Sequence, residues 1–367
     1  MNKKTIWGII TIAIILVVIV AINKNISQSN KPIKIGAIFP MTGTSATYGE
    51  MAKKAIDLAL LSDPNLHDVS VIYEDSQFQS VPALNAYQKL KNDGVKFFMT
   101  IGSQVGSTIG PKARGDGLFN FELTAVTPVY RDKSSLTCRA ALTADVSSNI
   151  LANYLKQHGL KRLALFVTDD AQGAAYNSNM KQIVTTFGGS VIESETYQLS
   201  DNDFRTQITK IKSAKPDALL LISPGQQAQA ILQQLKDLAF NKPVVSNNFT
   251  IENASLKNLS LAEGIIFSDF AYGGSNISST TVDFQKQFKD AYHQDPPIVS
   301  ATAHDALQLI AKAIKQVGSN PTAVGAWIST THNYNGVSGK LSFDSDCEAG
   351  QGVILKIVKD GQFVPYK

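Results

Sequence analysis

The stretch IKIGAIFPMTGTSATYGEMAKKAIDLAL, residues 33–60, joins a short apolar run, a loop and an amphipathic pattern. Residues 33–39 are typical of a buried strand. Residues 36–49 then contain three glycines, one proline and five hydroxyl-bearing side chains. From Met51 onward, apolar residues recur at three- and four-residue spacing, which predicts a helix. Because glycines and hydroxyls let backbone and side chains approach a small molecule closely, this loop is a candidate ligand contact.

The same alternation continues along the chain. Short apolar runs, several with flanking Gly or Pro, predict further buried strands at residues 69–73, 97–101, 163–167, 218–222 and 264–267. Apolar residues at helical spacing predict helices at residues 51–61, 81–90, 150–155, 180–187, 231–238 and 301–314. Strands that alternate with helices indicate an α/β fold with parallel, doubly wound sheets.

The alternation runs twice. A first set ends near residues 127–128, and a second begins near residue 163 after a helical pattern at 146–157. The 367 residues are enough for two domains with sizeable cores. We therefore expect two α/β lobes, with ligands at the carboxyl ends of the strands, where the loop 36–49 also lies.

The charge of the chain is small and evenly distributed. The formal net charge is +4, and Lys and Arg form no basic run or stacked Arg/aromatic pattern. Hydrophobic residues make up 44% and charged residues 17% of the chain, as in folded soluble proteins. We expect no nucleic-acid partner.

Residues 1–30 differ from the rest. Lys3 and Lys4 precede an uncharged run at residues 6–22, which as a helix would reach roughly 25 Å. The run fits either a long signal-peptide core or an uncleaved anchor. Small residues are scarce at the cleavage positions and no Cys follows to carry a lipid, which favours the anchor. The preceding lysines predict a cytoplasmic N-terminus and an exported remainder.

The sequence contains no catalytic constellation. No Walker loop, strand-linked GxGxxG or GxSxG occurs, and no histidine pair has the spacing of a metalloprotease. His304 and Asp305 lie in an apolar helical pattern, which indicates a helix surface or a packed pair rather than a base and its orienter. Asp169 and Asp170 follow a strand and indicate a helix cap rather than a metal or phosphate site. We expect no enzyme activity, no cofactor and no bound metal.

The chain has two cysteines, Cys138 and Cys347. In an exported domain such a pair permits one disulfide, and two unrelated thiols are the alternative. Their spacing does not fit a zinc site.

Six motifs in register resemble the type I periplasmic binding proteins, in particular the branch that binds branched-chain amino acids. They are the opening stretch, FFMTIGSQVGSTIGPKA (97–113), LALFVTDDAQGAAY (163–176), EGIIFSDFAY (263–272), ATAHDALQLIAKAI (301–314) and VSGKLSFDSD (337–346). The resemblance covers residues 33–366. It implies two lobes that are joined by three hinge strands, close over a ligand and deliver it to an ABC permease of the inner membrane.

The resemblance also implies the lobe boundaries. Lobe one would comprise residues 33–140 and 270–349, and lobe two residues 141–269 and 350–367. Cys138 and Cys347 would then both lie in lobe one beside hinge crossings, where a disulfide between them is expected.

Several positions depart from the family's amino-acid site, which holds the ligand carboxylate with hydroxyls and amides of lobe one and the ammonium with an acid and an aromatic of lobe two. Gly106 occupies the position of the family's usual serine, and Val126 that of its usual threonine. Asn248 occupies the position of the usual acid, and Pro224 that of the usual aromatic residue. Glu122 stands near the expected carboxylate site, where its charge would repel an anion.

The predicted ligand is therefore small, polar and largely uncharged, such as an amide, a polyol or a modified amino acid. Tyr48 falls where the family places an aromatic wall, and the alternative is that it packs on its own lobe. For Gln226 and Gln227, the alternative to a ligand contact is a solvated position at the rim of the site. The predicted ligand contacts are Tyr48, Ser103, Gln104, Ser107, Thr124, Ala125, Gln172, Gln226 and Asn248.

The resemblance favours an exported solute-binding component of an ABC importer in the bacterial periplasm, anchored to the inner membrane or released there if the leader is cut. The alternative is a membrane-tethered interaction or sensor module with a decayed ligand site, for example an activator of a peptidoglycan synthase, since fold alone does not decide function.

Overall fold

The computed structural model describes residues 32–43, 45–127, 134–223, 225–251, 256, 258–272, 277–350 and 352–366. The predicted signal or anchor segment at residues 6–22 and the side chain of Gln226 lie outside this description. No helix among the described residues combines the length and the apolar character that a membrane span requires.

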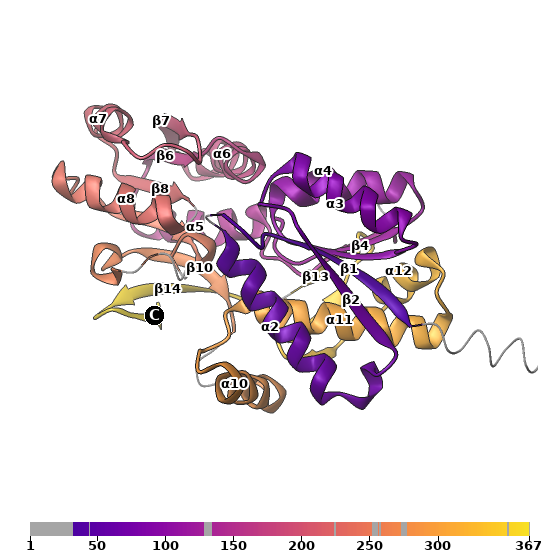
Figure 1. Ribbon diagram of the computed structural model, residues 1–367. Helices are drawn as coiled ribbons and strands as arrows, with labels where there is room; N and C mark the ends of the chain where they lie inside the picture. The colour runs from indigo at the N-terminus through magenta and orange to yellow at the C-terminus, as the bar shows by residue number, and fades with distance from the viewer. Residues whose placement is uncertain are drawn as a thin grey trace, which may run out of the picture.

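The first body is built on a five-stranded parallel sheet with the order β2-β1-β3-β4-β5 (Figure 1). Every residue of β3 and β4 is buried, as in a sheet covered on both faces. The strands are β1 (Ile33–Phe39), β2 (Val69–Asp75), β3 (Phe97–Thr100), β4 (Phe119–Glu122) and β5 (Thr137–Arg139).

Helices cover both faces of this sheet. On one face, α3 (Ser80–Asn92) and α4 (Ser103–Gly115) pack against β1 and β3 (Figure 1). The other face carries α2 (Ala46–Ser62) together with α11 (Ile298–Val317) and α12 (Pro321–Ser329). The helix α10 (Ser279–Tyr292) adds Phe284 and Phe288 to the same core. Residues near the C-terminal end of the chain thus complete the first body.

A small antiparallel sheet, with the order β11-β12-β13, joins this core. Its strands are β11 (Tyr334–Gly336), β12 (Gly339–Phe343) and β13 (Ala349–Gly350). The buried Asp305 carboxylate accepts hydrogen bonds from the backbone N–H groups of Val337 and Ser338, each at 2.9 Å. Asp305 therefore holds the β11–β12 turn, which favours the packed pair over the helix surface, the two alternatives predicted for His304 and Asp305.

The second body is built on a seven-stranded sheet with the order β15-β14-β10-β9-β8-β6-β7. Its strands are β6 (Arg162–Thr168), β7 (Ser190–Tyr197), β8 (Ala218–Ile222), β9 (Val244–Asn247), β10 (Ile266–Phe270), β14 (Val353–Lys359) and β15 (Gln362–Pro365). The helices α5 (Ala144–Gln157) and α6 (Ala171–Ile183) pack on one face. The other face carries α7 (Arg205–Ser213), α8 (Gly225–Asp237) and α9 (Asn248–Ile251).

The second sheet corrects the prediction of wholly parallel sheets. β14 and β15 pair antiparallel with β10 and with each other. A turn at Asp360 and Gly361, both with positive φ, joins β14 to β15. A connection this short can join only antiparallel strands, and positive φ at both turn residues matches the twist of a hairpin.

The predicted helix at residues 180–187 is also corrected. The α-helix ends at Ile183, and Val184–Phe187 form a 3₁₀ turn. The β-branched residues Val184, Thr185 and Thr186 are weak helix formers, and Gly188 ends the turn in the left-handed conformation.

The chain passes between the two bodies three times, after β5, after β10 and after β13. Cys138 on β5 and Cys347 before β13 are joined by a disulfide, with 4.6 Å between their Cα atoms. Beside it, the buried Arg139 guanidinium donates to the Ala125 and Thr127 carbonyl oxygens and pairs with the Glu348 carboxylate. These contacts tie the first and third passages together.

Candidate ligand-binding site

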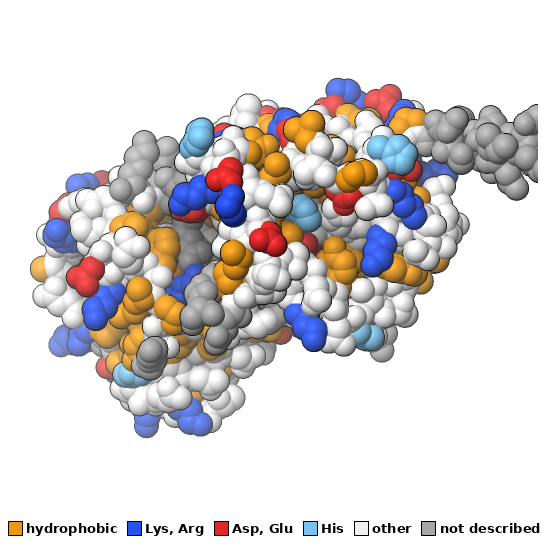
Figure 2. Space-filling view, turned by 90° about the horizontal axis from the view of Figure 1, so that it is seen from below, with side chains coloured by type: hydrophobic (Ala, Val, Ile, Leu, Met, Phe, Trp, Pro, Cys, Tyr) orange, Lys and Arg blue, Asp and Glu red, His pale blue; other side chains and the backbone are white. Residues whose placement is uncertain are grey.

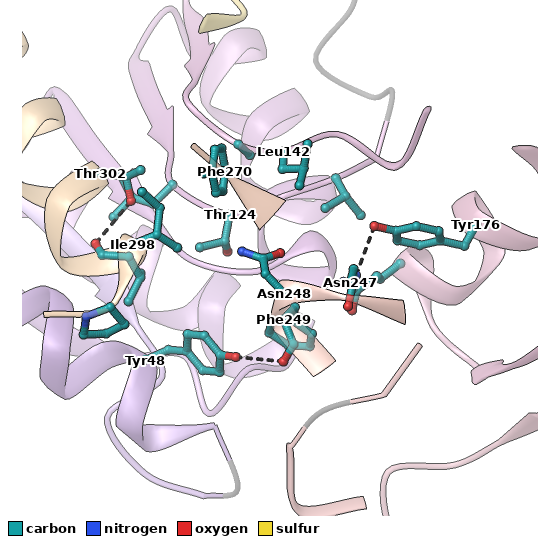
Figure 3. A pocket seen from close by; sticks show the side chains of 16 residues that line it. Tyr48, Thr124, Leu142, Tyr176, Asn247, Asn248, Phe249, Phe270, Ile298 and Thr302 are labelled. Atoms are coloured by element: carbon teal, nitrogen blue, oxygen red, sulfur yellow. Dashed lines mark hydrogen bonds between the residues drawn. The ribbon is translucent and has the colours of Figure 1, made fainter. Parts of the chain in front are cut away.

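A cavity of about 60 Å³ lies between the two bodies (Figure 3). It is bounded by the segments after β4, β6 and β9 and by the first turns of α2 and α11, so that it adjoins the carboxyl ends of parallel strands. It has room for a few waters or a very small molecule. The lining residues are Tyr48, Leu123, Thr124, Val126, Ala141, Leu142, Gln172, Tyr176, Asn247, Asn248, Phe249, Phe270, Pro297, Ile298, Val299 and Thr302.

The wall of this cavity is uncharged. None of the described residues that line it is Asp, Glu, Lys, Arg or His. Its polar side chains are amides and hydroxyls, which supply hydrogen-bond donors and acceptors without formal charge. A small neutral ligand suits such a wall, whereas an ion buried there would lack a countercharge.

Tyr48 and Phe249 join the two bodies across the cavity (Figure 3). The Tyr48 hydroxyl donates to the Phe249 carbonyl oxygen at 3.1 Å, and the two rings stack with their centroids 5.1 Å apart. Phe78, which follows β2, also stacks on the Phe249 ring, with the two ring centroids 6.2 Å apart. Tyr48 therefore contacts the opposite body, rather than packing on its own lobe alone.

Two neighbouring asparagines at the end of β9 differ in role. The Asn247 side chain donates to the Tyr176 hydroxyl at 3.0 Å and accepts from Thr250. Burial raises the pKa of Tyr176 to about 12, so its hydroxyl stays protonated at neutral pH. Asn247 thus positions the α9 turn, while the Asn248 amide points into the cavity (Figure 3).

Glu122 lies directly behind this wall, at the end of β4. Its side chain is fully buried. The Oε1 atom accepts from the backbone N–H groups of Gly102, Thr124 and Ala125, each at 3.0 Å, and Oε2 accepts from the Thr100 hydroxyl. Burial raises the pKa of Glu122 to about 7, although these hydrogen bonds oppose the shift.

Four of the predicted ligand contacts are brought together at the cavity. Tyr48 comes from α2, Thr124 from the segment after β4, Gln172 from α6 and Asn248 from α9. The family resemblance predicts these four contacts, and the segments that carry them converge because parallel strands end at one edge of a sheet. Asp170, predicted as a cap, accepts from the Gly173 N–H at 2.8 Å and begins α6 next to Gln172.

Of the other predicted contacts, Ser103, Gln104, Ser107 and Ala125 lie outside the cavity lining. The Ser103 hydroxyl accepts from the Val126 N–H at 3.1 Å, and the Ser107 hydroxyl bonds to that of Thr127 at 3.2 Å. Gln104 donates to Ser80 and borders a separate hollow of about 370 Å³. The Ala125 backbone N–H donates to Glu122, and its carbonyl oxygen accepts from Arg139. The side chain of Gln226 lies outside the described part of the structure.

Several lining residues were not predicted. Phe249 follows Asn248 directly in the sequence. An aromatic residue next to a predicted ligand contact is therefore the signal that could have identified it. Tyr176 lies one helical turn after Gln172 on α6. Ile298, Val299 and Thr302 carry no local signal, because only the packing of α11 on the first sheet brings them to the cavity.

A second groove of about 650 Å³ lies between α2, the start of α11 and the segment near β15. Thr47, Met51, Pro296, Lys356 and Phe363 are among its lining residues. Figure 2 shows the molecule from below, with hydrophobic side chains near the junction of the two bodies and charges of both signs that lie next to one another in several places. This groove lacks the convergent strand ends of the cavity.

Comparison with known proteins identifies the family. The periplasmic binding protein family matches residues 32–359, nearly the whole chain. The chain therefore belongs to the periplasmic binding proteins. These are solute-binding proteins rather than enzymes.

Among its relatives, the Leu/Ile/Val-binding protein BraC3 of Rhizobium johnstonii is 23% identical over 342 residues, covering 91% of this chain and 85% of the relative. The leucine-, isoleucine-, valine-, threonine- and alanine-binding protein of Pseudomonas aeruginosa is 23% identical over 335 residues, with 87% of each chain covered. Both alignments thus cover most of this chain and most of the relative.

Solved structures show the same fold. A leucine-binding protein from Thermotoga maritima superposes with a TM-score of 0.82 at 22% identity, covering 91% of this chain and 98% of the other. A solute-binding protein of an ABC transporter from R. palustris, in complex with benzoate, gives a TM-score of 0.82 at 20% identity, with 91% and 95% covered. At this identity the likeness establishes the architecture alone.

Proposed function

We propose that this protein is the exported solute-binding component of an ABC importer. In this proposal the two bodies are lobes, with lobe one at residues 33–140 and 270–349 and lobe two at 141–269 and 350–367. Residues 6–22 would anchor the protein to the inner membrane, with the lobes in the periplasm and the permease as its partner.

The observation that carries the proposal is the cavity between the bodies. Tyr48 and Thr124 on one side and Gln172 and Asn248 on the other converge at strand ends that are separated by up to 200 positions in sequence. A ligand that contacts both sides at once would bind the closed arrangement more tightly and so shift the lobe equilibrium toward it.

The ligand class follows from the uncharged wall. We infer a small neutral polar molecule, such as an amide or a polyol, rather than the zwitterionic amino acids after which the relatives are named. Amide and hydroxyl groups can satisfy such a ligand fully, whereas a buried ammonium or carboxylate would need a countercharge that the wall lacks.

A thermal-shift screen of the purified protein against amides, polyols, sugars, nucleosides and amino acids tests the proposal. A ligand at a hundred times its dissociation constant should stabilise the fold by about 2.7 kcal/mol. Asn248→Ala should abolish the shift. Asn149→Ala, which changes an exposed asparagine on α5, should leave it intact.

One observation supports the second candidate, an envelope interaction module with a decayed site. Phe249 occupies the space between Tyr48 and Phe78, and the remaining cavity is only about 60 Å³. If the folded protein responds to no compound in the screen, this candidate is preferred.

A further inference from the structure

The buried Glu122 carboxylate occupies a ready-made anion site. Three backbone N–H groups, from Gly102, Thr124 and Ala125, converge on one of its oxygens at 3.0 Å, and the Thr100 hydroxyl donates to the other. Convergent backbone N–H groups of this kind form a concave nest that binds anions. Here the anion comes from the chain itself.

The nest directly adjoins the cavity. Thr124 lines the cavity, its N–H belongs to the nest, and its hydroxyl oxygen lies 3.5 Å from Glu122 Oε1. That hydroxyl oxygen in turn accepts from the Gly102 N–H at 2.9 Å. The next amide along the chain, that of Val126, is bonded to the Ser103 hydroxyl at 3.1 Å. The donors of this wall are thus already engaged within the protein.

The charge of Glu122 acts in the same direction. The groups that contact its carboxylate among the described residues are neutral amides and hydroxyls. A ligand carboxylate beside Thr124 would therefore meet a like charge across a poorly solvated wall, and one of the two groups would have to take up a proton. A neutral carbonyl or hydroxyl meets no such penalty.

We propose that Glu122 determines the specificity of the cavity, because its negative charge lies directly behind Thr124 and its carboxylate engages the backbone N–H groups there, so that the cavity accepts neutral amides and excludes carboxylates. This inference rests on the proposed function, namely that the cavity binds a solute. It adds the residue that sets the ligand class and the mechanism by which it does so.

The first experiment empties the nest. Glu122→Ala leaves three N–H groups facing a cavity of side-chain size, so free acetate should bind there and raise the Tm of this variant by about 2–4 °C at 100 mM. Acetamide should raise the Tm of this variant no more than that of wild type. Wild type and Glu122→Gln, in which a side-chain oxygen still fills the nest, should not respond to acetate. An equal response to acetate in all three proteins, or none in Glu122→Ala, overturns the proposal.

The second experiment measures preference and remains decisive if Glu122→Ala does not fold. Titration calorimetry at pH 8 compares acetamide with acetate, which have the same shape and differ in charge. Wild type should bind acetamide at least tenfold more tightly, and Glu122→Gln, which removes the charge, should reduce that preference at least tenfold. Glu122→Asp keeps the charge and should retain the preference for the amide.

Two results of this titration contradict the proposal. One is that wild type binds acetate as tightly as acetamide or binds neither compound, and the other is that the preference survives in Glu122→Gln. The proposed function fails separately. A carboxylate found by the thermal-shift screen would contradict the role of Glu122 while supporting solute binding.

Discussion

Among single residues, Glu122 is a buried carboxyl group directly behind the cavity wall. Its environment combines complete burial, which disfavours the charged form, with several donors, which favour it. The burial effect is larger, so its pKa rises to about 7. A group with this pKa changes charge near neutral pH, which makes its contribution to stability measurable.

We predict that stability falls between pH 5 and pH 8 because of Glu122. The folded protein holds the proton up to about pH 7, whereas the unfolded chain releases it near pH 4.5. The stabilisation is therefore fully present below pH 4.5 and is lost as the pH rises through 7. Melting curves of wild type and Glu122→Gln should differ by several degrees more at pH 8 than at pH 5, in favour of the variant. Parallel curves across this range would contradict the assigned pKa.

Between elements, the two bodies repeat one close contact. A Cβ atom at Gly49 on α2 would lie 2.1 Å from the Pro40 carbonyl oxygen, and one at Gly173 on α6 would lie 1.9 Å from that of Thr168. In each body the helix that follows the first strand therefore passes over the end of that strand without a side chain between them. This brings Tyr48 and Gln172, each next to its glycine, to the cavity from opposite sides.

We predict that Gly173→Ala destabilises the protein by about 1–3 kcal/mol or more, because α6 must move away from β6 to admit the methyl group. Urea denaturation measures the loss. Gly115→Ala is the matched control, since Gly115 lies at the end of α4 with open space around its Cβ position. The two variants should differ by more than 1 kcal/mol, and equal stabilities would refute the close packing.

For the whole molecule, the relation between the two bodies depends on the aromatic contact of Tyr48, Phe78 and Phe249. A hydrogen bond contributes about 0.5–1.5 kcal/mol and a stacked aromatic pair a similar amount. Contacts of this size change a population of arrangements without locking it.

We predict that Phe249→Ala shifts the two bodies toward a more open arrangement, because it removes the stacking contacts with both Tyr48 and Phe78. Small-angle scattering should show a larger radius of gyration than for wild type. Tyr48→Phe removes the hydroxyl but keeps the rings and should have a smaller effect. An unchanged radius in Phe249→Ala would mean that other contacts hold the bodies together.

The disulfide also acts on the whole molecule, since it joins residues 209 positions apart. The chain-entropy model gives a loop of this length a stabilisation of about 5 kcal/mol. We predict that the Cys138→Ser/Cys347→Ser variant loses stability of this order in urea denaturation. Reductant should lower the stability of wild type and leave that of the double variant unchanged. A double variant as stable as wild type would show that the disulfide does not stabilise the fold.

Much of the fold was predictable from local pattern. The strand at 33–39, the helix that follows it and the alternation of the two bodies depend on hydrophobic periodicity, which is a local property. The cap at Asp170 was likewise readable from the chain. The antiparallel pairing of β14 and β15 was not predictable in this way. The chain reaches β14 by its third passage between the bodies and reaches β15 by a tight turn, and neither connection is a crossover helix.

The sequence by itself determined the α/β class, the family and the loops that carry the site, because spacing along a strand or helix depends only on near neighbours. Only the tertiary structure decided which loop residues share the cavity. Tyr48 and Asn248 meet across two sheets, Ile298 arrives from a distant helix, and Ser103 turns to the Val126 backbone instead. It also decided that Glu122 fills the nest of N–H groups, since long-range packing removes that carboxylate from water while strand ends bring the donors together.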